Sequence, residues 1–497
     1  MEKTTLELLY DNSKNYSERL ALLCKTEAVT YSELWEQIRK CSAYFISNGL
    51  KAGQIVLIKA AQTPDYLICY YALQLAGAIP CSLERNTPSK TVHELLDKMN
   101  AAMIISESMA DTKTNKVKTF FTDAVRKDSA DIDVSNISFS FPDPESTQIV
   151  LFTTGTTGVS KGVEISYRAM QSSEEKIRDF LHMDTYSENG LFVTPTPLNH
   201  AKGIWEVGGM LRSAGTICLL KNMSNLQDYF NALDYPCEKL LLSLVPANLR
   251  MLLMMAPDEL KRRADKIGAI KLGTAPLLEH DKNLVCKLLP NTELHNPYGS
   301  SEAGILCSYM FNENQGLEFC IGKPLKGTEV FVVDDERKPI SSSKRKMGRL
   351  AFRSNSAMKG YYNEPNLTKS VLIDGIIYTN DYGYVDKNGF VYIKGRVDDV
   401  INIGGLKVSP DEVEAEAISV PGVADCICTS SKDSITGNAL KLLVVMKDKG
   451  TLNISSIKKF LTNRLEQYKI PKYYLEVDEI ARTSNGKLNR KFYRESV

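Results

Sequence analysis

The sequence predicts an α/β protein with a large N-terminal domain of α/β sheets, a small β-barrel-like subdomain and a small α+β domain at the C-terminal end. Helical patterns alternate with short apolar strands over the first hundred or so residues, which is typical of a sheet with helices on its faces. Short strands separated by glycines run from about 322 to 394, and the pattern changes again after Arg396. A chain of 497 residues is also too long for one core of usual size, so more than one domain is expected.

Composition narrows the class of partner. Lys plus Arg number 61 and Asp plus Glu number 60, so no charge surplus points to nucleic acid or to an acidic membrane. The start of the chain lacks an apolar targeting segment, and no apolar run is long enough to span a bilayer. The 11 cysteines and 5 histidines show no metal-ligand spacing, so the cysteines are expected to be buried thiols. We therefore expect a cytoplasmic protein with a small-molecule partner, no nucleic acid and no membrane span.

In the N-terminal part, helices and strands are expected to alternate. The segment 31–50, YSELWEQIRKCSAYFISNGL, has helical periodicity, whereas QIVLIKA (54–60) and MIISES (103–108) are short apolar runs typical of strands. The segment 111–148 is polar and rich in Ser, Asp and Lys, which predicts a surface excursion before the next strand.

The C-terminal part begins with a predicted helix start. Ser409-Pro410-Asp411-Glu412 has the pattern of a capping box, with proline in the first turn, where its missing N–H costs nothing. The helix is expected to end before PGV (421–423), and two strands should follow. A helix near 454–467, a further strand and a polar tail with RTSNGKLNRK complete the expected order.

The stretch LFTTGTTGVSKGVEIS (151–166) resembles a phosphate-binding loop. A Walker A loop reads GxxxxGK[ST] and opens a helix. Here two residues separate Gly158 from Lys161, and the residues that follow alternate as a strand. We therefore expect the loop to join two strands, which excludes a kinase-like P-loop enzyme.

Five stretches, in this order, resemble motifs of the adenylate-forming superfamily of acyl- and aryl-CoA synthetases, peptide-synthetase adenylation domains and luciferases, closest in character to acyl-CoA synthetases. They are TTGTTGVSKG (153–162), NPYGSSEAG (296–304), YTNDYGYVD (378–386), GRVDDVINIGGLKVSPDEVE (395–414) and RTSNGKLNRK (482–491). The resemblance covers essentially the whole chain. It implies that a carboxylate attacks the α-phosphate of ATP, giving an acyl-adenylate and pyrophosphate, and that a thiol then displaces AMP.

The resemblance implies which residues bind the nucleotide. Tyr298 would stack on adenine, and Ser301 takes a site that is usually threonine. Glu302 would hold Mg²⁺, a hard cation that takes oxygen ligands and bridges to phosphates. Lys161 would add positive charge at the β- and γ-phosphates, next to a loop that offers hydroxyls and backbone N–H groups. That loop consists of Thr153, Thr154, Gly155, Thr156, Thr157 and Gly158.

Three further residues take roles from the resemblance. Asp381 has the position of the acid that accepts both ribose hydroxyls, although Asn380 replaces the common glycine before it, and Arg396 would contact the same sugar. Lys487 would bridge the carboxylate and the α-phosphate and stabilise charge that develops in the transition state. Ala481 stands where proline is usual.

The C-terminal domain is expected to move. Asp398 matches the hinge about which this mobile domain swings between the two half-reactions. Gly404 and Gly405 would form the face along which a pantetheine arm passes, because a missing side chain allows close approach. The expected domains are therefore 1–396 and 397–497, with the β-barrel-like subdomain inside the first.

The acid-binding pocket is expected around His200, where related CoA synthetases commonly carry an aromatic residue or histidine beside the substrate carboxylate. Ala201 stands where amino-acid-activating relatives have an aspartate for the α-amine, and a buried ammonium needs a partner. An apolar or aromatic acid is therefore favoured over an α-amino acid. The other expected lining residues are Val245, Gly273, Thr274 and Ala275.

Three functions stay open at this point. The favoured one is an AMP-forming acid–thiol ligase that uses ATP, Mg²⁺ and CoA. The second is a stand-alone ligase that loads the acid onto the phosphopantetheine of an acyl or peptidyl carrier protein. The third, an inactive adenylate-binding scaffold, is disfavoured because Lys161, Glu302, Asp381 and Lys487 are all present.

Overall fold

The chain divides into two compact units. The computed structural model describes residues 3–25, 27–109, 111, 117–154, 160–275, 277–403, 406–433, 436–482 and 488–495. The first unit comprises Met1–Gly316, Gly322–Glu329 and Phe352–Ile377, and the second comprises Leu317–Ile321, Val330–Ala351 and Tyr378–Val497.

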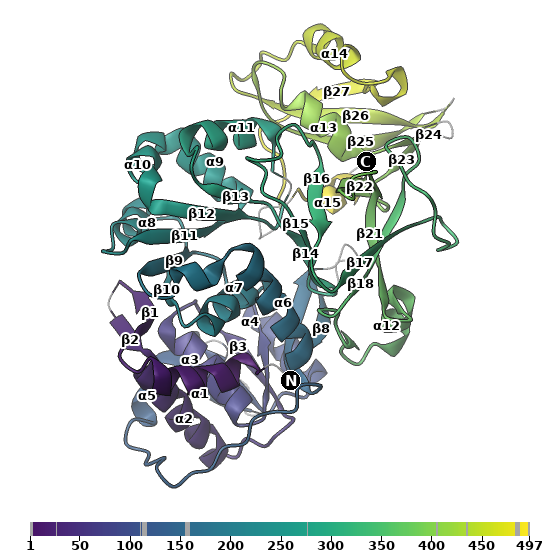
Figure 1. The fold of residues 1–497 in the computed structure, drawn as a ribbon. Helices are drawn as coiled ribbons and strands as arrows, with labels where there is room; N and C mark the ends of the chain where they lie inside the picture. Colours follow the sequence, from purple (N-terminus) through teal and green to yellow (C-terminus); the bar gives the residue numbers. More distant parts are fainter. Residues whose placement is uncertain are drawn as a thin grey trace. The chain divides into compact units, whose positions relative to one another are not determined.

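The first sheet of the first unit is mostly parallel (Figure 1). Its strand order is β13-β12-β11-β9-β10-β1-β2, and only β1 and β2 pair antiparallel. Strand β9 is buried along its whole length, as expected of a parallel strand covered on both faces. The strands are β1 (Leu20–Cys24), β2 (Glu27–Thr30), β9 (Gly190–Thr194), β10 (Thr216–Leu219), β11 (Lys239–Leu244), β12 (Ile267–Leu272) and β13 (Glu293–His295).

The second sheet of this unit has the order β19-β8-β7-β4-β3-β5-β6. Strands β7, β4, β3, β5 and β6 run parallel, and β8 pairs antiparallel with both β7 and β19. The strands are β3 (Ile55–Lys59), β4 (Ile79–Ser82), β5 (Met103–Ser106), β6 (Lys118–Phe121), β7 (Thr147–Thr154), β8 (Ser160–Ser166) and β19 (Gly360–Tyr361). A shorter antiparallel set contains β14 (Tyr298–Ser300), β15 (Gly304–Ser308) and β16 (Cys320–Pro324).

Helices surround these sheets, and several begin at the residues that local chemistry favours. Thr4 and Thr30 each form a capping box with the glutamate three residues on, at the starts of α1 and α2. Ser166 caps α6 by accepting from the Ala169 N–H. The helices are α1 (Thr5–Asn15), α2 (Tyr31–Ser47), α3 (Pro64–Leu75), α4 (Ser89–Lys98), α5 (Thr122–Asp128), α6 (Tyr167–Phe180), α7 (Ala201–Arg212), α8 (Leu226–Leu233), α9 (Pro246–Met255), α10 (Pro257–Arg262), α11 (Glu279–Leu288) and α12 (Pro365–Val371).

The second unit contains antiparallel strands followed by a small α+β part (Figure 1). Strands β22, β21, β18 and β17 are neighbours in that order, and β25, β26 and β27 form a separate sheet with its own apolar core against α13 and α14. The elements wholly or partly in this unit are β17 (Thr328–Val333), β18 (Gly348–Ser354), β21 (Ile376–Val385), β22 (Val391–Arg396), β23 (Ile401–Ile403), β24 (Leu406–Val408), α13 (Pro410–Ala417), β25 (Val423–Asp433), β26 (Gly437–Met446), α14 (Ile454–Thr462), β27 (Tyr473–Glu476) and α15 (Arg490–Glu495), whereas β20 (Leu372–Ile373) belongs to the first unit.

Two local expectations are wrong. The segment 111–148 is not only a surface excursion, because it contains β6 and α5 and begins with Asp111, which is buried in an ion pair with Lys59 at 3.0 Å. Ser409 is the N-cap residue of α13, but its hydroxyl makes no capping bond and faces Gly395. Glu412 does not fold back on it, because its carboxylate pairs with Lys469 at 3.0 Å.

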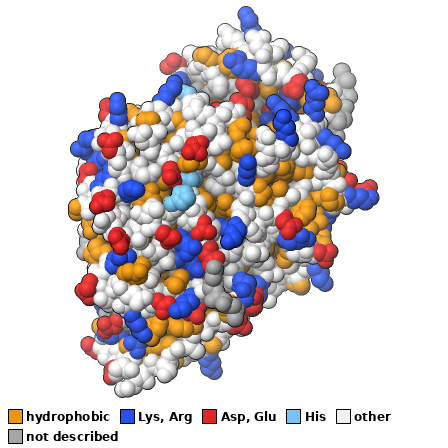
Figure 2. Space-filling model, viewed as in Figure 1, with side chains coloured by type: hydrophobic (Ala, Val, Ile, Leu, Met, Phe, Trp, Pro, Cys, Tyr) orange, Lys and Arg blue, Asp and Glu red, His pale blue; other side chains and the backbone are white. Residues whose placement is uncertain are grey.

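The predicted fold class is confirmed, with several sheets, helices on their faces, a large N-terminal part and a small α+β C-terminal part. Figure 2 shows basic and acidic side chains interspersed over the visible face, in keeping with the balanced charge. Within the described ranges, every helix is too short or too polar to cross a membrane.

Candidate active site

The glycine–threonine loop lies between two strands. Strands β7 and β8 pair antiparallel, in a register that sets Thr153 opposite Lys161. This confirms the expected arrangement, which differs from a Walker A loop because no helix follows directly. Four predicted phosphate-binding residues, Gly155, Thr156, Thr157 and Gly158, lie outside the described residues, as do the side chains of Thr153 and Thr154.

Lys161 and Glu302 meet on one aromatic side chain, Tyr361. The Tyr361 hydroxyl donates a hydrogen bond to Glu302 Oε1 at 3.0 Å, and the Lys161 ammonium lies 5.5 Å from the centre of the Tyr361 ring. Burial, together with the Glu302 charge, raises the pKa of the Tyr361 phenol well above its ordinary value, so the hydroxyl remains a donor. Sequence reasoning missed Tyr361, because nothing in the spacing of GYYNEP (360–365) connects it to either partner.

The hairpin of β14 and β15 fixes the main chain around Glu302. At Gly304 the backbone φ is 74°, and a Cβ there would lie 2.1 Å from the Cβ of Ser356, so only glycine fits. The Glu302 carbonyl accepts from the Met358 N–H at 2.8 Å. The hairpin carries the three predicted residues Tyr298, Ser301 and Glu302, all half-buried.

A buried lysine holds this hairpin against α6. Lys176 is 6% exposed and is paired with no carboxylate within the described residues. Burial lowers its pKa from 10.5 to about 8. Its ammonium donates to four neutral oxygens: the Ile305 carbonyl at 3.2 Å and the hydroxyls of Thr328 at 3.0 Å, Ser354 at 2.9 Å and Ser356 at 3.0 Å.

The predicted acid-pocket residues gather at one edge of the first sheet. His200 lies in the segment between β9 and α7, Val245 directly follows β11, and Gly273 directly follows β12. These three strands are adjacent and parallel, and the carboxyl ends of such strands are the usual ligand-binding edge of an α/β sheet. Thr274 has a φ of 81°, which is rare for a residue other than glycine and is common at binding sites. Ala275 follows and is half-buried.

His200 and Ala201 stand at the start of α7. His200 is the N-cap residue, but its side chain makes no capping bond. Its Nε2 lies 4.0 Å from Glu84 Oε1. Ala201 is the first residue of the helix and is buried. Because its side chain is a methyl group, this position offers no carboxylate to a ligand.

A buried charge cluster of Lys202, Glu206 and Lys271 backs the same edge. Glu206 Oε1 lies 2.5 Å from Lys271 Nζ and 3.5 Å from Lys202 Nζ. The Ser243 hydroxyl connects the two side chains, because it donates to Glu206 Oε1 at 2.8 Å and accepts from the Lys202 ammonium at 2.9 Å. Burial lowers the pKa of Lys202 to about 8, whereas for Glu206 the two lysines outweigh burial and lower the pKa. A Cβ at Gly273 would lie 3.9 Å from Lys202 Cε, so the cluster adjoins the predicted pocket.

In the second unit, the predicted ribose residues and the predicted hinge residue form one cluster. Strands β21 and β22 set Asp381 opposite Arg396. The Arg396 guanidinium lies 3.8 Å from Asp381 Oδ1 and 3.8 Å from Asp398 Oδ2. The amide of Asn380, which replaces the family's common glycine, donates to Asp398 Oδ2 at 2.8 Å. Lys487, Gly404 and Gly405 lie outside the described residues.

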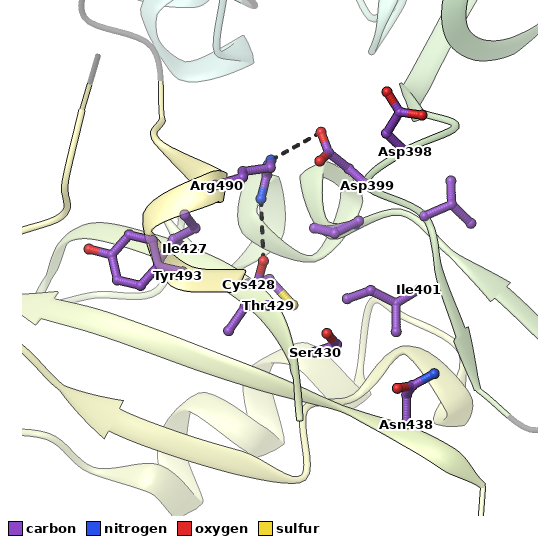
Figure 3. A pocket seen from close by; sticks show the side chains of 12 residues that line it. Asp398, Asp399, Ile401, Ile427, Cys428, Thr429, Ser430, Asn438, Arg490 and Tyr493 are labelled. Atoms are coloured by element: carbon purple, nitrogen blue, oxygen red, sulfur yellow. Dashed lines mark hydrogen bonds and ion pairs between the residues drawn. The ribbon is translucent and has the colours of Figure 1, made fainter. Parts of the chain in front are cut away.

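Arg490, shortly after Lys487, anchors the last helix (Figure 3). Its guanidinium pairs with Asp411 and, at 2.7 Å, with Glu414. It also lies 3.5 Å from Asp399, a contact that Figure 3 shows. Burial raises the pKa of Glu414 to about 7, although Arg490 opposes that rise. A cavity of about 300 Å³ borders Arg490, Asp399 and Asp398. Sequence reasoning missed this anchor, which connects α15 to the segment beside the predicted hinge.

The donor set suits a magnesium ion bound together with a nucleotide. Within the described ranges, no group of three or more His, Cys, Asp or Glu side chains could hold a metal alone. Glu302 offers a carboxylate, and Mg²⁺ is usually bound through one or two carboxylates plus substrate phosphates. A single acid at this hairpin therefore fits the ion.

Solved structures of similar fold include nucleotide complexes. ATP-bound MatB from Rhodopseudomonas palustris aligns with a TM-score of 0.89 at 21% identity, over 100% of this chain and 99% of that one. The o-succinylbenzoate CoA synthetase MenE from Bacillus subtilis, in complex with ATP and magnesium, aligns with a TM-score of 0.86 at 21% identity, over 99% of both chains.

Curated relatives match over nearly the whole length. A 4-coumarate-CoA ligase from Narcissus pseudonarcissus is 24% identical over 98% of this chain and 92% of its own. A long-chain-fatty-acid–CoA ligase from Bacillus subtilis is 25% identical, over 98% and 94%. The fatty acid–[acyl-carrier-protein] ligase MmaC from Mycobacterium marinum is 26% identical, over 98% and 96%.

Family models account for most of the chain. The model described as AMP-binding enzyme matches residues 9–362, and the model of the AMP-binding enzyme C-terminal domain matches residues 412–487. The first match alone covers more than half of the sequence. With a fold that aligns along the full chain, these matches show that the protein belongs to the AMP-binding enzyme family and is a ligase of that family.

Proposed function

We propose that the protein activates a carboxylic acid with ATP and Mg²⁺ to an acyl-adenylate and then transfers the acyl group to the thiol of CoA, releasing pyrophosphate and AMP. The observation that carries this proposal is that Lys161 and Glu302, distant in the sequence, both contact Tyr361. Binding of a nucleoside triphosphate with its metal ion requires a cation that contacts the phosphates and, close to it, a carboxylate that contacts the metal.

In the first half-reaction, the loop 153–158 and Lys161 would bind the β- and γ-phosphates, and Glu302 would hold the metal. When bound there, Mg²⁺ would offset phosphate charge. Tyr298 would present its half-buried ring to adenine, and Ser301 would add a hydroxyl beside Glu302. Asp381 and Arg396 would contact the ribose, and Lys487 would stabilise the charge that develops as the carboxylate oxygen bonds to the α-phosphorus.

In the second half-reaction, we propose that residues 397–497 swing about Asp398 as a mobile domain against residues 1–396. Gly404 and Gly405 would then line the path of the pantetheine arm. The thiolate attacks the acyl carbon, and AMP leaves with the electron pair of the broken C–O bond.

The substrate proposal rests on the edge formed by β9, β11 and β12. His200 would lie beside the carboxylate, and Val245, Gly273, Thr274 and Ala275 would line the remainder. An apolar or aromatic acid is proposed over an α-amino acid, because buried Ala201 supplies no partner for an ammonium. We place the reaction in the cytoplasm, where free thiols such as the eleven cysteines of this chain persist.

A second candidate is transfer to the phosphopantetheine of a carrier protein. It is favoured by the similarity to MmaC, whose name is that of an acyl-carrier-protein ligase. The two functions share the first half-reaction and differ only in the acceptor of the acyl group.

Product analysis by mass spectrometry separates these functions. The protein is incubated with ATP, Mg²⁺ and a panel of acids, with CoA in one series and holo-carrier proteins in another. Acyl-CoA supports the first function, and acyl-carrier product supports the second. If no acid yields AMP and pyrophosphate, the catalytic proposal fails and the adenylate-binding scaffold takes its place.

A further inference from the structure

Tyr361 is held rigidly by its own backbone. Strand β19 pairs antiparallel with β8, which sets Tyr361 opposite Val163, two residues after Lys161. The Tyr361 N–H donates to the Thr368 hydroxyl at 2.8 Å, and its carbonyl accepts from the Glu364 N–H at 3.0 Å. The backbone of Tyr361 is therefore fixed by β8 on one side and by α12 on the other, and this fixes the position from which the ring projects.

The two ends of this side chain meet opposite charges. Its hydroxyl donates to Glu302 Oε1 at 3.0 Å, and its ring lies 5.5 Å from the Lys161 ammonium, within the range of a cation–π contact. In the described part of the chain no ion pair joins Lys161 and Glu302 directly. Such a pair would neutralise both groups, and neither would then be ready for a ligand.

The Glu302 main chain is fixed by the same short segment. Its carbonyl accepts from Met358 at 2.8 Å, three residues before Tyr361. Main chain and carboxylate are therefore both bonded to residues 358–361. A carboxylate that is already oriented loses less conformational entropy when it binds a cation than one that must be ordered first.

We propose that Tyr361 is a positioning residue that orients the Glu302 carboxylate for Mg²⁺ and keeps it apart from the Lys161 ammonium, so that the ammonium is available to the phosphates of ATP. This role deepens the proposed function and rests on it. The hydroxyl serves the orientation and the ring serves the separation, so each half can be tested by its own substitution.

Tyr361→Phe removes the hydroxyl and keeps the ring. We expect it to weaken Mn²⁺ binding about 10- to 150-fold, the range for a lost hydrogen bond to a charged group. Binding is measured from the loss of the free-Mn²⁺ electron paramagnetic resonance signal, with a non-hydrolysable ATP analogue present. The Mg²⁺ concentration for half-maximal pyrophosphate release should rise in parallel, while the KM for ATP at saturating Mg²⁺ stays unchanged.

Tyr361→Leu removes both the hydroxyl and the ring. We expect the same loss of metal affinity and, in addition, a rise in the KM for ATP, because the ammonium can then pair with the carboxylate. Tyr362→Phe is the matched control, since it removes a hydroxyl from the adjacent ring, and it should behave as wild type. Tryptophan fluorescence checks that each variant folds, and Tyr361→Met replaces the leucine variant if that one unfolds.

The two substitutions test the two roles of Tyr361, orientation of the carboxylate and separation of the charges, one at a time. Equal Mn²⁺ affinity for wild type and Tyr361→Phe would overturn the orienting role, and an unchanged KM for ATP in Tyr361→Leu would overturn the separating role. The Mn²⁺ titration needs no turnover. A wild type that binds Mn²⁺ with the nucleotide but releases no pyrophosphate with any acid would therefore count against the proposed function alone.

Discussion

The buried ammonium of Lys176 predicts a pH-dependent stability of the first unit. Its four partners are neutral oxygens, and burial lowers its pKa from 10.5 to about 8. Below the folded-state pKa, the lysine is protonated in both the folded and the unfolded state, and the folded state bears the full cost of the buried charge. Between the two pKa values the folded state releases its proton and the unfolded state keeps it. The free energy of unfolding therefore rises with pH across this window.

The size of the rise follows from the shift. A difference of one pKa unit corresponds to about 1.4 kcal/mol, so the full effect of Lys176 is about 3 kcal/mol. Integration between about pH 7.5 and about pH 9.5 gives about 2 kcal/mol of added stability. Lys176→Met lacks the titrating group, so the difference in unfolding free energy between wild type and Lys176→Met should change by about 2 kcal/mol over that interval.

Tryptophan fluorescence during urea unfolding measures this difference. The sequence has 2 tryptophans, Trp35 and Trp205, both buried and both in the first unit, so the signal follows that unit. Other titrating groups, such as Lys202, cancel when the two proteins are compared at the same pH. Ser354→Ala is the control, because it removes one acceptor, keeps the lysine and should retain the rise. A difference between wild type and Lys176→Met that stays constant with pH would refute the reasoning.

Three further predictions concern the reaction. Lys487→Ala should abolish acid-dependent pyrophosphate formation and leave thiolysis of preformed acyl-adenylate largely intact. Lys491→Ala is the control. Adenylation by Lys487→Ala at near wild-type rate would contradict the role given to Lys487. Asp398→Pro should spare adenylation and block thioester formation, because proline fixes φ near about −65°. Asp398→Ala removes the same carboxylate without that restriction, and loss of both half-reactions in the alanine variant would indicate that the contacts of Asp398 with Arg396 and Asn380 matter more than the hinge. Carboxylic acids without an α-amino group should be activated in preference to their α-amino analogues by roughly 5- to 150-fold in kcat/KM, because an unpaired buried ammonium costs about 1–3 kcal/mol. Phenylpropanoic acid against phenylalanine is a suitable pair. Consistent preference for the amino acids would overturn the assignment of Ala201.

The parts of the fold that depend on local pattern could be predicted from the sequence. The helix of residues 31–50 and the strand–loop–strand around Lys161 follow from periodicity within a few residues. The capping box at Ser409 was a local pattern as well, yet it is wrong, because Lys469 binds Glu412 instead. A distant ion pair can outweigh a local hydrogen bond, and no short sequence pattern reveals which distant residue will form that pair.

The buried charges could not be predicted for a related reason. Glu174 and Lys176 lie in a charged run of α6, where helical patterning indicates a face exposed to water, but both are buried. Neighbouring elements supply their partners: Thr5 of α1 donates to Glu174, and the hydroxyls of residues 354 and 356 accept from Lys176. Lys202 of α7 is another example, since its partner Ser243 belongs to strand β11. Burial of a charge depends on tertiary contacts that the residues around it do not encode.

The segment 354–361 shows how such contacts unite the candidate site of the first unit. Ser354 and Ser356 accept from Lys176, which also holds the strand following Glu302. Met358 donates to the Glu302 carbonyl, and Tyr361 reaches both its carboxylate and the Lys161 ammonium. Apart from the bond between Lys176 and Ile305, these contacts all start from the same eight residues, so a displacement of the segment must move the Glu302 carboxylate and the surroundings of Lys161 together. Substitutions that shift this backbone should therefore weaken metal and phosphate binding jointly, whereas Tyr361→Phe, which leaves the backbone in place, should affect the metal alone.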